Sequence, residues 1–138
     1  MNKVLLFAIL LLFFNSCSDE ERSLLMKELK DCDRVKIYFY KDGGSTPGGD
    51  NMIFTIDSKD TIQMFLDGIS DESTPKLKCG YNGSIEFFRG GKSVKNMEFN
   101  LMPECRHIVF SAKQNYFSKR LNDKGLILLN SYKDKIIK

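Results

Sequence analysis

Residues 79–91 read CGYNGSIEFFRGG, and the expected fold depends on this stretch. Asn82-Gly83 and Gly90-Gly91 are dipeptides that favour tight hairpin turns, because both tolerate positive φ angles. Between them, Ser84–Arg89 carries the β-branched and aromatic residues that are common in strands. The stretch therefore predicts one strand of an antiparallel sheet, with a turn at each end.

Further strands are expected on both sides of this stretch. Apolar and polar residues alternate in Val35–Tyr40 and Met97–Leu101, as they do in strands with one buried face, and Met52–Ile56 is expected to be the strand that follows the first of these. Cys105–Ser111 and Asn115–Leu121 have the composition and spacing of a last hairpin.

Two helices are expected beside these strands. Asp57 or Ser58 can cap the first helix, and Asn122 can cap the second, although Gly125 lowers helix propensity near its start. The apolar stripes are Ile62, Phe65, Leu66 and Ile69 in the first, and Leu126, Leu129, Tyr132 and Ile136 in the second. This order of elements predicts an α+β fold, an antiparallel sheet of about five to six strands with two helices packed on one face.

The beginning of the chain has the pattern of a targeting segment. Lys3 is followed by an unbroken apolar run of eleven residues, Val4–Phe14. As a helix this run would be roughly 16 Å long, about half of the ~30 Å thickness of a bilayer core. It is too short to span a membrane but has the length of a signal-peptide core, so a signal peptide is expected over residues 1–16.

The end of this run, Phe14-Asn15-Ser16-Cys17, resembles the lipobox of bacterial lipoproteins. The resemblance implies that Cys17 is acylated, with palmitate as one of its chains, and that the chain is cut just before it. The resemblance implies that the protein is located at the bacterial outer membrane and is held there by its lipid anchor. An ordinary secreted protein in which Cys17 occurs by chance is the alternative.

The segment after Cys17 is acidic and polar. Residues 17–33 are expected to form a lipid-anchored tether, in which Ser23–Lys30 is either a short helix or extended chain. The acidic residues Asp19–Glu21 resemble the surface-export tags of some bacterial lipoproteins, which implies display on the cell surface. A solvated linker with no targeting role is the alternative. Residues 34–138 are expected to form a single α+β domain.

Charge and cysteine content limit the functions to consider. The chain has 138 residues, a net charge of +3 and no concentrated basic patch, so no nucleic-acid partner is expected. If Cys17 carries lipid, then Cys32, Cys79 and Cys105 allow three disulfide pairings in an oxidising compartment. Cys79 with Cys105 is favoured, because both lie in strand-rich sequence.

A second resemblance covers part of the same region. The run from Cys79-Gly80-Tyr81 through Phe99-Asn100-Leu101 to Cys105-Arg106-His107 resembles a strand module of small, uncharacterised bacterial lipoproteins. It implies a framework of strands joined by paired cysteines, and it implies no substrate.

The leading hypothesis is a lipid-anchored binding module of the envelope that is not an enzyme, needs no cofactor and binds a protein or glycan. Its binding residues would be aromatic and arginine side chains on the sheet face that the helices leave open, because tyrosine and arginine are enriched at interfaces. The proposed set is Tyr38, Tyr40, Arg89, Arg106 and Tyr116, with Tyr81, Phe88 and Arg120 as further members. The alternative is that the aromatic residues complete the core.

Two other functions stay open. A thiol- or metal-dependent enzyme could be centred on Cys105 and His107, with Cys79 as a third metal ligand. A disulfide between Cys79 and Cys105 would remove the thiolate from both versions, so no catalytic or metal-binding residues are predicted. A purely structural envelope lipoprotein is the third hypothesis. Glu86 and Glu98 alternate with apolar neighbours, so they are expected to face solvent rather than catalyse a reaction.

Overall fold

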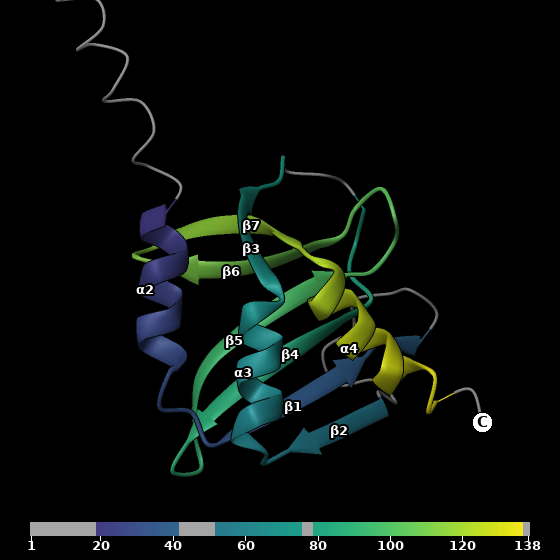
Figure 1. The fold of residues 1–138 in the computed structure, drawn as a ribbon, viewed down its shortest axis with the longest axis horizontal. Coiled ribbons are helices and arrows are strands. Elements are labelled where there is room, and N and C mark those ends of the chain that lie inside the picture. The colour runs from purple at the N-terminus through teal and green to yellow at the C-terminus, as the bar shows by residue number, and fades with distance from the viewer. Residues whose placement is uncertain (1–18, 42–51, 76–78, 137–138) are drawn as a thin grey trace, which may run out of the picture.

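The computed structural model describes residues 19–41, 52–75 and 79–136 of the chain (Figure 1). The signal peptide expected over residues 1–16 and the expected lipidation site Cys17 lie outside this part. The helices are α2 (Asp19–Leu29), α3 (Lys59–Asp67) and α4 (Asp123–Lys133). The strands are β1 (Arg34–Phe39), β2 (Met52–Ile56), β3 (Ile69–Ser73), β4 (Gly83–Arg89), β5 (Lys92–Asn100), β6 (His107–Ala112) and β7 (Asn115–Leu121).

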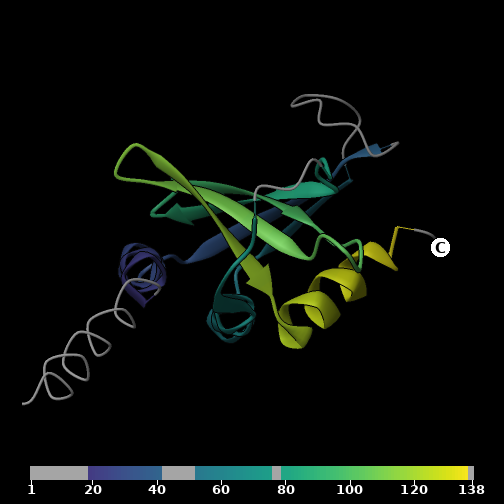
Figure 2. The same ribbon diagram turned by 90° about the horizontal axis from the view of Figure 1, so that it is seen from above.

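All strands in the described part of the chain join one antiparallel sheet, and all described helices lie on the same face of it. The sheet has seven strands in the order β2-β1-β4-β5-β6-β7-β3. Figure 2 shows α2, α3 and α4 together on one side of the sheet. The predicted α+β class and the one-sided helix layer are confirmed, with seven strands and three helices in place of about five to six and two. Among the described residues, no helix has the length and apolar character needed to cross a membrane.

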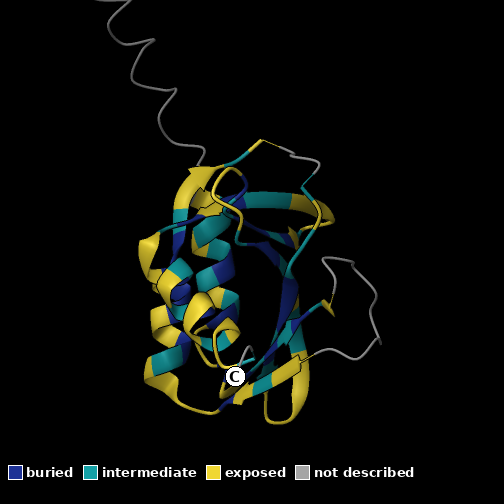
Figure 3. Ribbon diagram, turned by 90° about the vertical axis from the view of Figure 1, so that its right-hand side faces the viewer, coloured by how far each residue is buried: buried dark blue, intermediate teal, exposed yellow. Residues whose placement is uncertain are grey.

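The core lies between the helices and the sheet. Because side chains alternate across a strand, every second residue of β1, β4, β5 and β6 points toward the helices. Figure 3 shows the buried stretches concentrated where the helices meet the sheet. The buried strand residues include Val35, Ile37, Phe39, Ile85, Phe87, Met97, Phe99, Ile108 and Phe110. The opposite face of the sheet carries no described helix and is called the open face below.

Strand β3 was not expected from the sequence. Helix α3 begins as predicted, with the Ser58 side chain accepting a hydrogen bond from the Thr61 amide, but it ends at Asp67. Ile69, assigned to the helix stripe, is instead the first residue of β3 and pairs with Leu121. The rest of β3 is polar and its register is irregular, so it lacks the composition by which strands are recognised.

The Asn82-Gly83 turn was also predicted wrongly. Gly83 is the first residue of β4 and pairs with Phe39 and Phe99. A Cβ atom at Gly83 would lie 2.1 Å from the Tyr38 carbonyl oxygen, so glycine is required by close packing and not by a turn. Gly90 and Gly91 do form the predicted β4–β5 turn, with φ angles of 55° and 78°.

Most of the expected tether is a helix that belongs to the core. Leu25 and Leu29 of α2 are 0% and 1% exposed, so the folded domain begins before residue 34. The charged residues of α2 form ion pairs with the rest of the domain. Glu20 and Glu21 of the acidic segment therefore belong to the folded domain and not to a linker. The ion pairs of α2 are Glu20–Lys113, Glu21–Lys119, Arg22–Asp71 and Glu28–Lys95.

One of these ion pairs is buried. The Lys119 side chain is 0% exposed, and its Nζ atom lies 2.8 Å from a Glu21 carboxylate oxygen. The same ammonium donates hydrogen bonds to the Asp71 carbonyl oxygen at 3.1 Å and to the Ser73 hydroxyl at 3.0 Å. A buried ammonium is tolerated only when charge and hydrogen bonds replace its water. Glu21 therefore ties α2 to β3 and β7.

Replacing Glu21 with glutamine removes the carboxylate beside the buried ammonium. We expect the free energy of unfolding to fall by about 3 kcal/mol, because Lys119 keeps the cost of burial and loses its opposite charge. Urea denaturation measures this change. Glu20→Gln is the matched control: it removes a solvent-exposed pair and should cost no more than about 0.5 kcal/mol. Equal losses in the two variants would contradict this role of Glu21.

Gly125, which lowers the helix propensity of α4, is explained by the contact of α4 with the end of α3. A Cβ atom at Gly125 would lie 2.8 Å from the Gly68 carbonyl oxygen, and one at Gly68 would lie 2.4 Å from the Gly125 Cα atom. The backbone amide of Asn122 also donates a hydrogen bond to the Gly68 carbonyl oxygen at 2.9 Å. The two helices approach backbone to backbone here, so both positions need glycine.

Gly125→Ala separates helix propensity from packing. Propensity alone would stabilise the helix by about 1 kcal/mol. The clash with Gly68 forces the helices apart, and overpacking of this kind costs about 1–3 kcal/mol. We expect a net loss of stability in thermal unfolding. Ser131→Ala, at an exposed site of the same helix, should change little, and a more stable Gly125→Ala variant would refute the packing argument.

Candidate binding site on the open sheet face

The tyrosines predicted to bind a partner lie on or beside the open face. Tyr38 is on β1 between the buried Ile37 and Phe39, so its side chain lies on the opposite side of the sheet from theirs. Tyr116 of β7 is 74% exposed. Tyr40 follows β1 in the same alternation and is close enough to Tyr81 to affect its pKa. The structure thus brings the expected aromatic residues to one face.

Two of the arginines predicted for the same face, Arg89 and Arg106, lie elsewhere. Arg89 donates to the carbonyl oxygen of Glu28 in α2, and Arg106 forms an ion pair of 3.6 Å with Asp123 of α4. Both contacts are with helices, on the covered side of the sheet. The reason is the two-residue alternation, since Arg89 follows Phe88 and Arg106 precedes His107, and both of those residues are on the open face. Arg120 of β7 is directly opposite His107 in the β6–β7 register, so it does lie on the open face, where it forms an ion pair of 2.9 Å with Glu72. The predicted combination of arginine with tyrosine on one face is therefore wrong for Arg89 and Arg106.

Two glutamates occupy the open face beside the tyrosines. The Tyr38 hydroxyl donates a 3.1 Å hydrogen bond to Glu86, and burial, followed by this bond, raises the pKa of Tyr38. Glu98 of β5 lies directly opposite Val109 of β6. Burial raises the pKa of Glu98, and no ion pair to Glu98 occurs within the described part of the chain. The open face therefore carries tyrosine and carboxylate side chains, with Lys36 directly opposite Glu86 in the β1–β4 register and no such cation opposite Glu98 on the described neighbouring strands.

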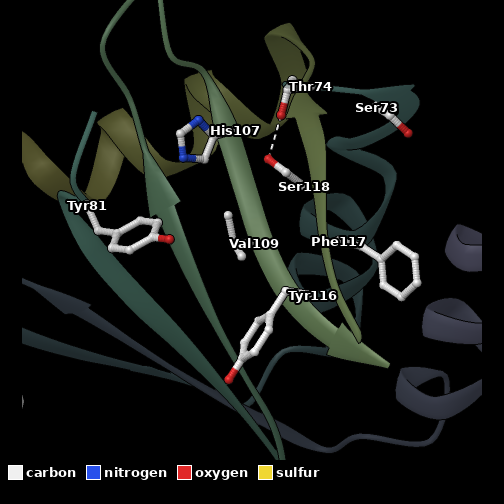
Figure 4. A pocket seen from close by; sticks show the side chains of 8 residues that line it. All are labelled: Ser73, Thr74, Tyr81, His107, Val109, Tyr116, Phe117 and Ser118. Atoms are coloured by element: carbon white, nitrogen blue, oxygen red, sulfur yellow. Dashed lines mark hydrogen bonds between the residues drawn. The ribbon is translucent and has the colours of Figure 1, made fainter. Parts of the chain in front are cut away.

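A pocket of about 460 Å³ opens on this face, and Glu98 borders it because Glu98 is directly opposite the lining residue Val109 and is near Tyr81. Figure 4 shows the side chains of Tyr81, His107, Val109 and Tyr116 around the pocket, while the Phe117 ring points away from them on the other side of β7. The lining residues are Ser73, Thr74, Tyr81, His107, Val109, Tyr116, Phe117 and Ser118. This space is called the central pocket below.

His107 presents a defined chemical group to the central pocket. Its Nδ1 atom is hydrogen-bonded to the Cys105 carbonyl oxygen, and the residue is 3% exposed. A carbonyl oxygen only accepts, so Nδ1 is the donor in this bond and Nε2 is the ring nitrogen left for the pocket. The ring also packs edge-on against Tyr81, with centroids 6.1 Å apart. His107 is thus a fixed wall residue with one ring nitrogen, Nε2, available to a ligand.

Tyr81 is held in place by the loop that carries it. The buried Asn100 side chain donates to the carbonyl oxygens of Cys79 and Gly80, at 3.1 and 3.0 Å. The Asn82 side chain accepts from the Leu101 amide at 2.7 Å. Burial raises the pKa of Tyr81, and the nearby Glu98 raises it further. Tyr81 therefore keeps its hydroxyl proton at neutral pH and can both donate and accept.

The disulfide Cys79–Cys105 is present, as predicted. It joins the Tyr81 loop to the turn before β6, while Cys32 is free and buried. The thiol and metal hypotheses for Cys105 and His107 need a free Cys105 sulfur, which this bond removes. In the described part of the chain, no group of three histidine, cysteine, aspartate or glutamate residues is arranged to hold a metal ion.

Five lining residues of the central pocket were not anticipated from the sequence, namely Ser73, Thr74, Val109, Phe117 and Ser118. Val109 follows His107 by two positions on β6, so alternation alone could have placed it on the same face. Ser118 and Thr74 meet through their hydroxyls, and the Thr74 amide donates to the Ser118 carbonyl oxygen at 3.0 Å. That contact depends on the β3–β7 pairing, for which the polar sequence of β3 gives no signal.

Comparisons of the chain with models of known protein families, with curated proteins and with solved structures found no match.

Glu98→Gln tests the electrostatic description of the open face. The raised pKa of Glu98 means that the folded state favours its neutral form, so the ionised carboxylate lowers stability near neutral pH. The glutamine variant should therefore melt at a higher temperature near neutral pH. This advantage should disappear as the pH falls through the pKa of Glu98. Glu104→Gln, at an exposed turn, should show no such pH-dependent gain. A less stable Glu98→Gln variant near neutral pH would contradict the description.

Proposed function

We propose that this protein is a non-enzymatic binding module of the bacterial envelope, anchored through lipid on Cys17, whose open sheet face contacts a partner. The observation that carries the proposal is the central pocket and the cluster of tyrosine and glutamate around it. Side chains on this face do not contribute to the helix-covered core, and Tyr116 presents most of its ring to solvent. Exposed tyrosine beside a concave surface is characteristic of interfaces.

The proposed anchor fits the position of α2. Cys17 precedes the first residue of α2 by two positions, so little chain separates the proposed lipid from the folded domain. Two or more acyl chains hold a protein firmly at a bilayer, whereas one chain does so only marginally. The open face would then meet partners at the membrane surface, with the bacterial outer membrane as the proposed location.

The competing functions make different demands. A purely structural lipoprotein needs no ligand and does not account for a pocket with aligned polar groups. An enzyme centred on Cys105 would require reduction of its disulfide before any chemistry. Binding by the open face needs neither a free thiol nor a cofactor, so it uses the features of the described structure most directly.

Tyr116→Ala should reduce capture of the partner from a detergent extract of the envelope by about fivefold or more, because exposed aromatic residues in a binding surface are frequent hot spots. Quantitative mass spectrometry of the captured proteins measures the change. Arg106→Ala is the control, since Arg106 binds Asp123 on the covered side. Both variants should keep the wild-type melting temperature. Loss of capture with Arg106→Ala but not with Tyr116→Ala would overturn the assignment of the face.

The anchor is tested by the intact mass of the protein isolated from membranes. We expect a chain that begins at Cys17 and carries the mass of the acyl groups, with alkylation of Cys79 and Cys105 only after reduction. Cys17→Ser should lose the acyl mass and leave the membrane fraction. A wild-type chain without lipid would rule out the proposed anchor and leave the open face to be tested separately.

A further inference from the structure

We infer that the central pocket, with Glu98 at its border, receives a lysine or arginine side chain from a partner protein. This inference rests on the binding role proposed for the open face and specifies the chemistry of its ligand. It follows from the charge of the described residues around the pocket, from the rings that line it and from the polar atoms that it presents.

The first argument is the position of Glu98. Glu98 and Val109 are directly opposed in the β5–β6 register, so their Cβ atoms are about 5 Å apart on the same face. Val109 lines the pocket, which places the carboxylate next to it. The folded domain supplies burial to Glu98 but no ion pair among the described residues. A cation entering the pocket would supply the missing opposite charge.

The second argument is the nature of the walls. Tyr81 and Tyr116 offer ring faces, which attract cations and pack against the methylene groups of lysine and arginine. The hydroxyl oxygens of Thr74 and Ser118 can accept hydrogen bonds, and so can His107 Nε2 when that atom carries no proton. No lysine or arginine is among the described lining residues, and the charge of the neighbouring Arg120, which is opposite His107, is balanced by Glu72 at 2.9 Å. The pocket thus combines acceptors with aromatic surface, which suits a group that only donates.

The third argument concerns the source of the cation. The open face continues from the pocket to Tyr38 and Glu86, whose side chains are joined by a hydrogen bond. A basic segment of a partner protein can place one side chain in the pocket while its neighbours contact this second tyrosine–glutamate pair. An anionic ligand would be repelled by Glu98, whereas Glu86 has Lys36 directly opposite it in the β1–β4 register. A small free polyamine would fill the pocket but leave the rest of the face unused.

The test uses the mature chain and two fluorescent peptides in anisotropy titrations at low salt. One peptide alternates lysine and serine, and the other has the same sequence with every lysine acetylated. We expect the lysine peptide to bind at least about tenfold more tightly, because acetylation removes the charge and the ammonium donors. Glu98→Gln should weaken binding of the lysine peptide about fivefold or more.

Asp60→Asn is the matched control, because it removes one exposed negative charge in the first turn of α3, on the covered side of the sheet. It should leave the affinity unchanged. Equal binding of the two peptides, or equal losses in Glu98→Gln and Asp60→Asn, would overturn the inference. Spermidine that binds as tightly as the lysine peptide, with the same dependence on Glu98, would overturn the choice of a protein partner. In each of these cases, partner capture that depends on Tyr116 would still support the open face as the binding surface.

Discussion

One-sided burial is the constraint on which the rest of the structure depends. All three described helices cover the same face of a seven-stranded antiparallel sheet, so every strand except the irregular β3 sends alternate side chains into the core and the others to the open face. The core-facing set is almost wholly apolar. The open-face set is free of that requirement, and it is there that tyrosine, glutamate and histidine collect. Because of this geometry, the residues that stabilise the core and the residues proposed to bind a partner lie on opposite faces of the sheet.

Helix α2 completes the covered side and links it to the proposed anchor. Its apolar residues enter the core, and its charged residues form ion pairs with strands that are distant in sequence, including the buried Lys119. The acidity of Glu20 and Glu21 therefore has a structural explanation, independent of any export signal. Because α2 begins two residues after Cys17, the segment that reaches the membrane and the segment that holds the domain together are nearly continuous.

Local patterns predicted the α+β class, the bounds of β2 and β7, the caps of α3 and α4 and the disulfide, because each depends on nearby residues or on strand composition. The sequence did not reveal β3 or the role of Gly83, since pairing with β7 and contact with Tyr38 are long-range. The misplaced arginines are a different case. Arg89 is next to Phe88 and Arg106 is next to His107, so neither arginine can share the open face with that neighbour. Strict use of the strand alternation would have replaced Arg89 and Arg106 with Glu98 in the predicted site.

Hydroxyl-radical footprinting tests the central claim, that the open face is the one that meets a partner, most directly. Oxidation of the protein in intact envelopes is compared with oxidation of the purified protein, residue by residue. Tyr116 is exposed on the open face, whereas Met64 and Ile127 are 56% and 70% exposed on the helices. The account predicts that Tyr116 is protected in the envelope and that Met64 and Ile127 react equally in both samples. Protection of the helix residues with an unprotected Tyr116 would contradict it.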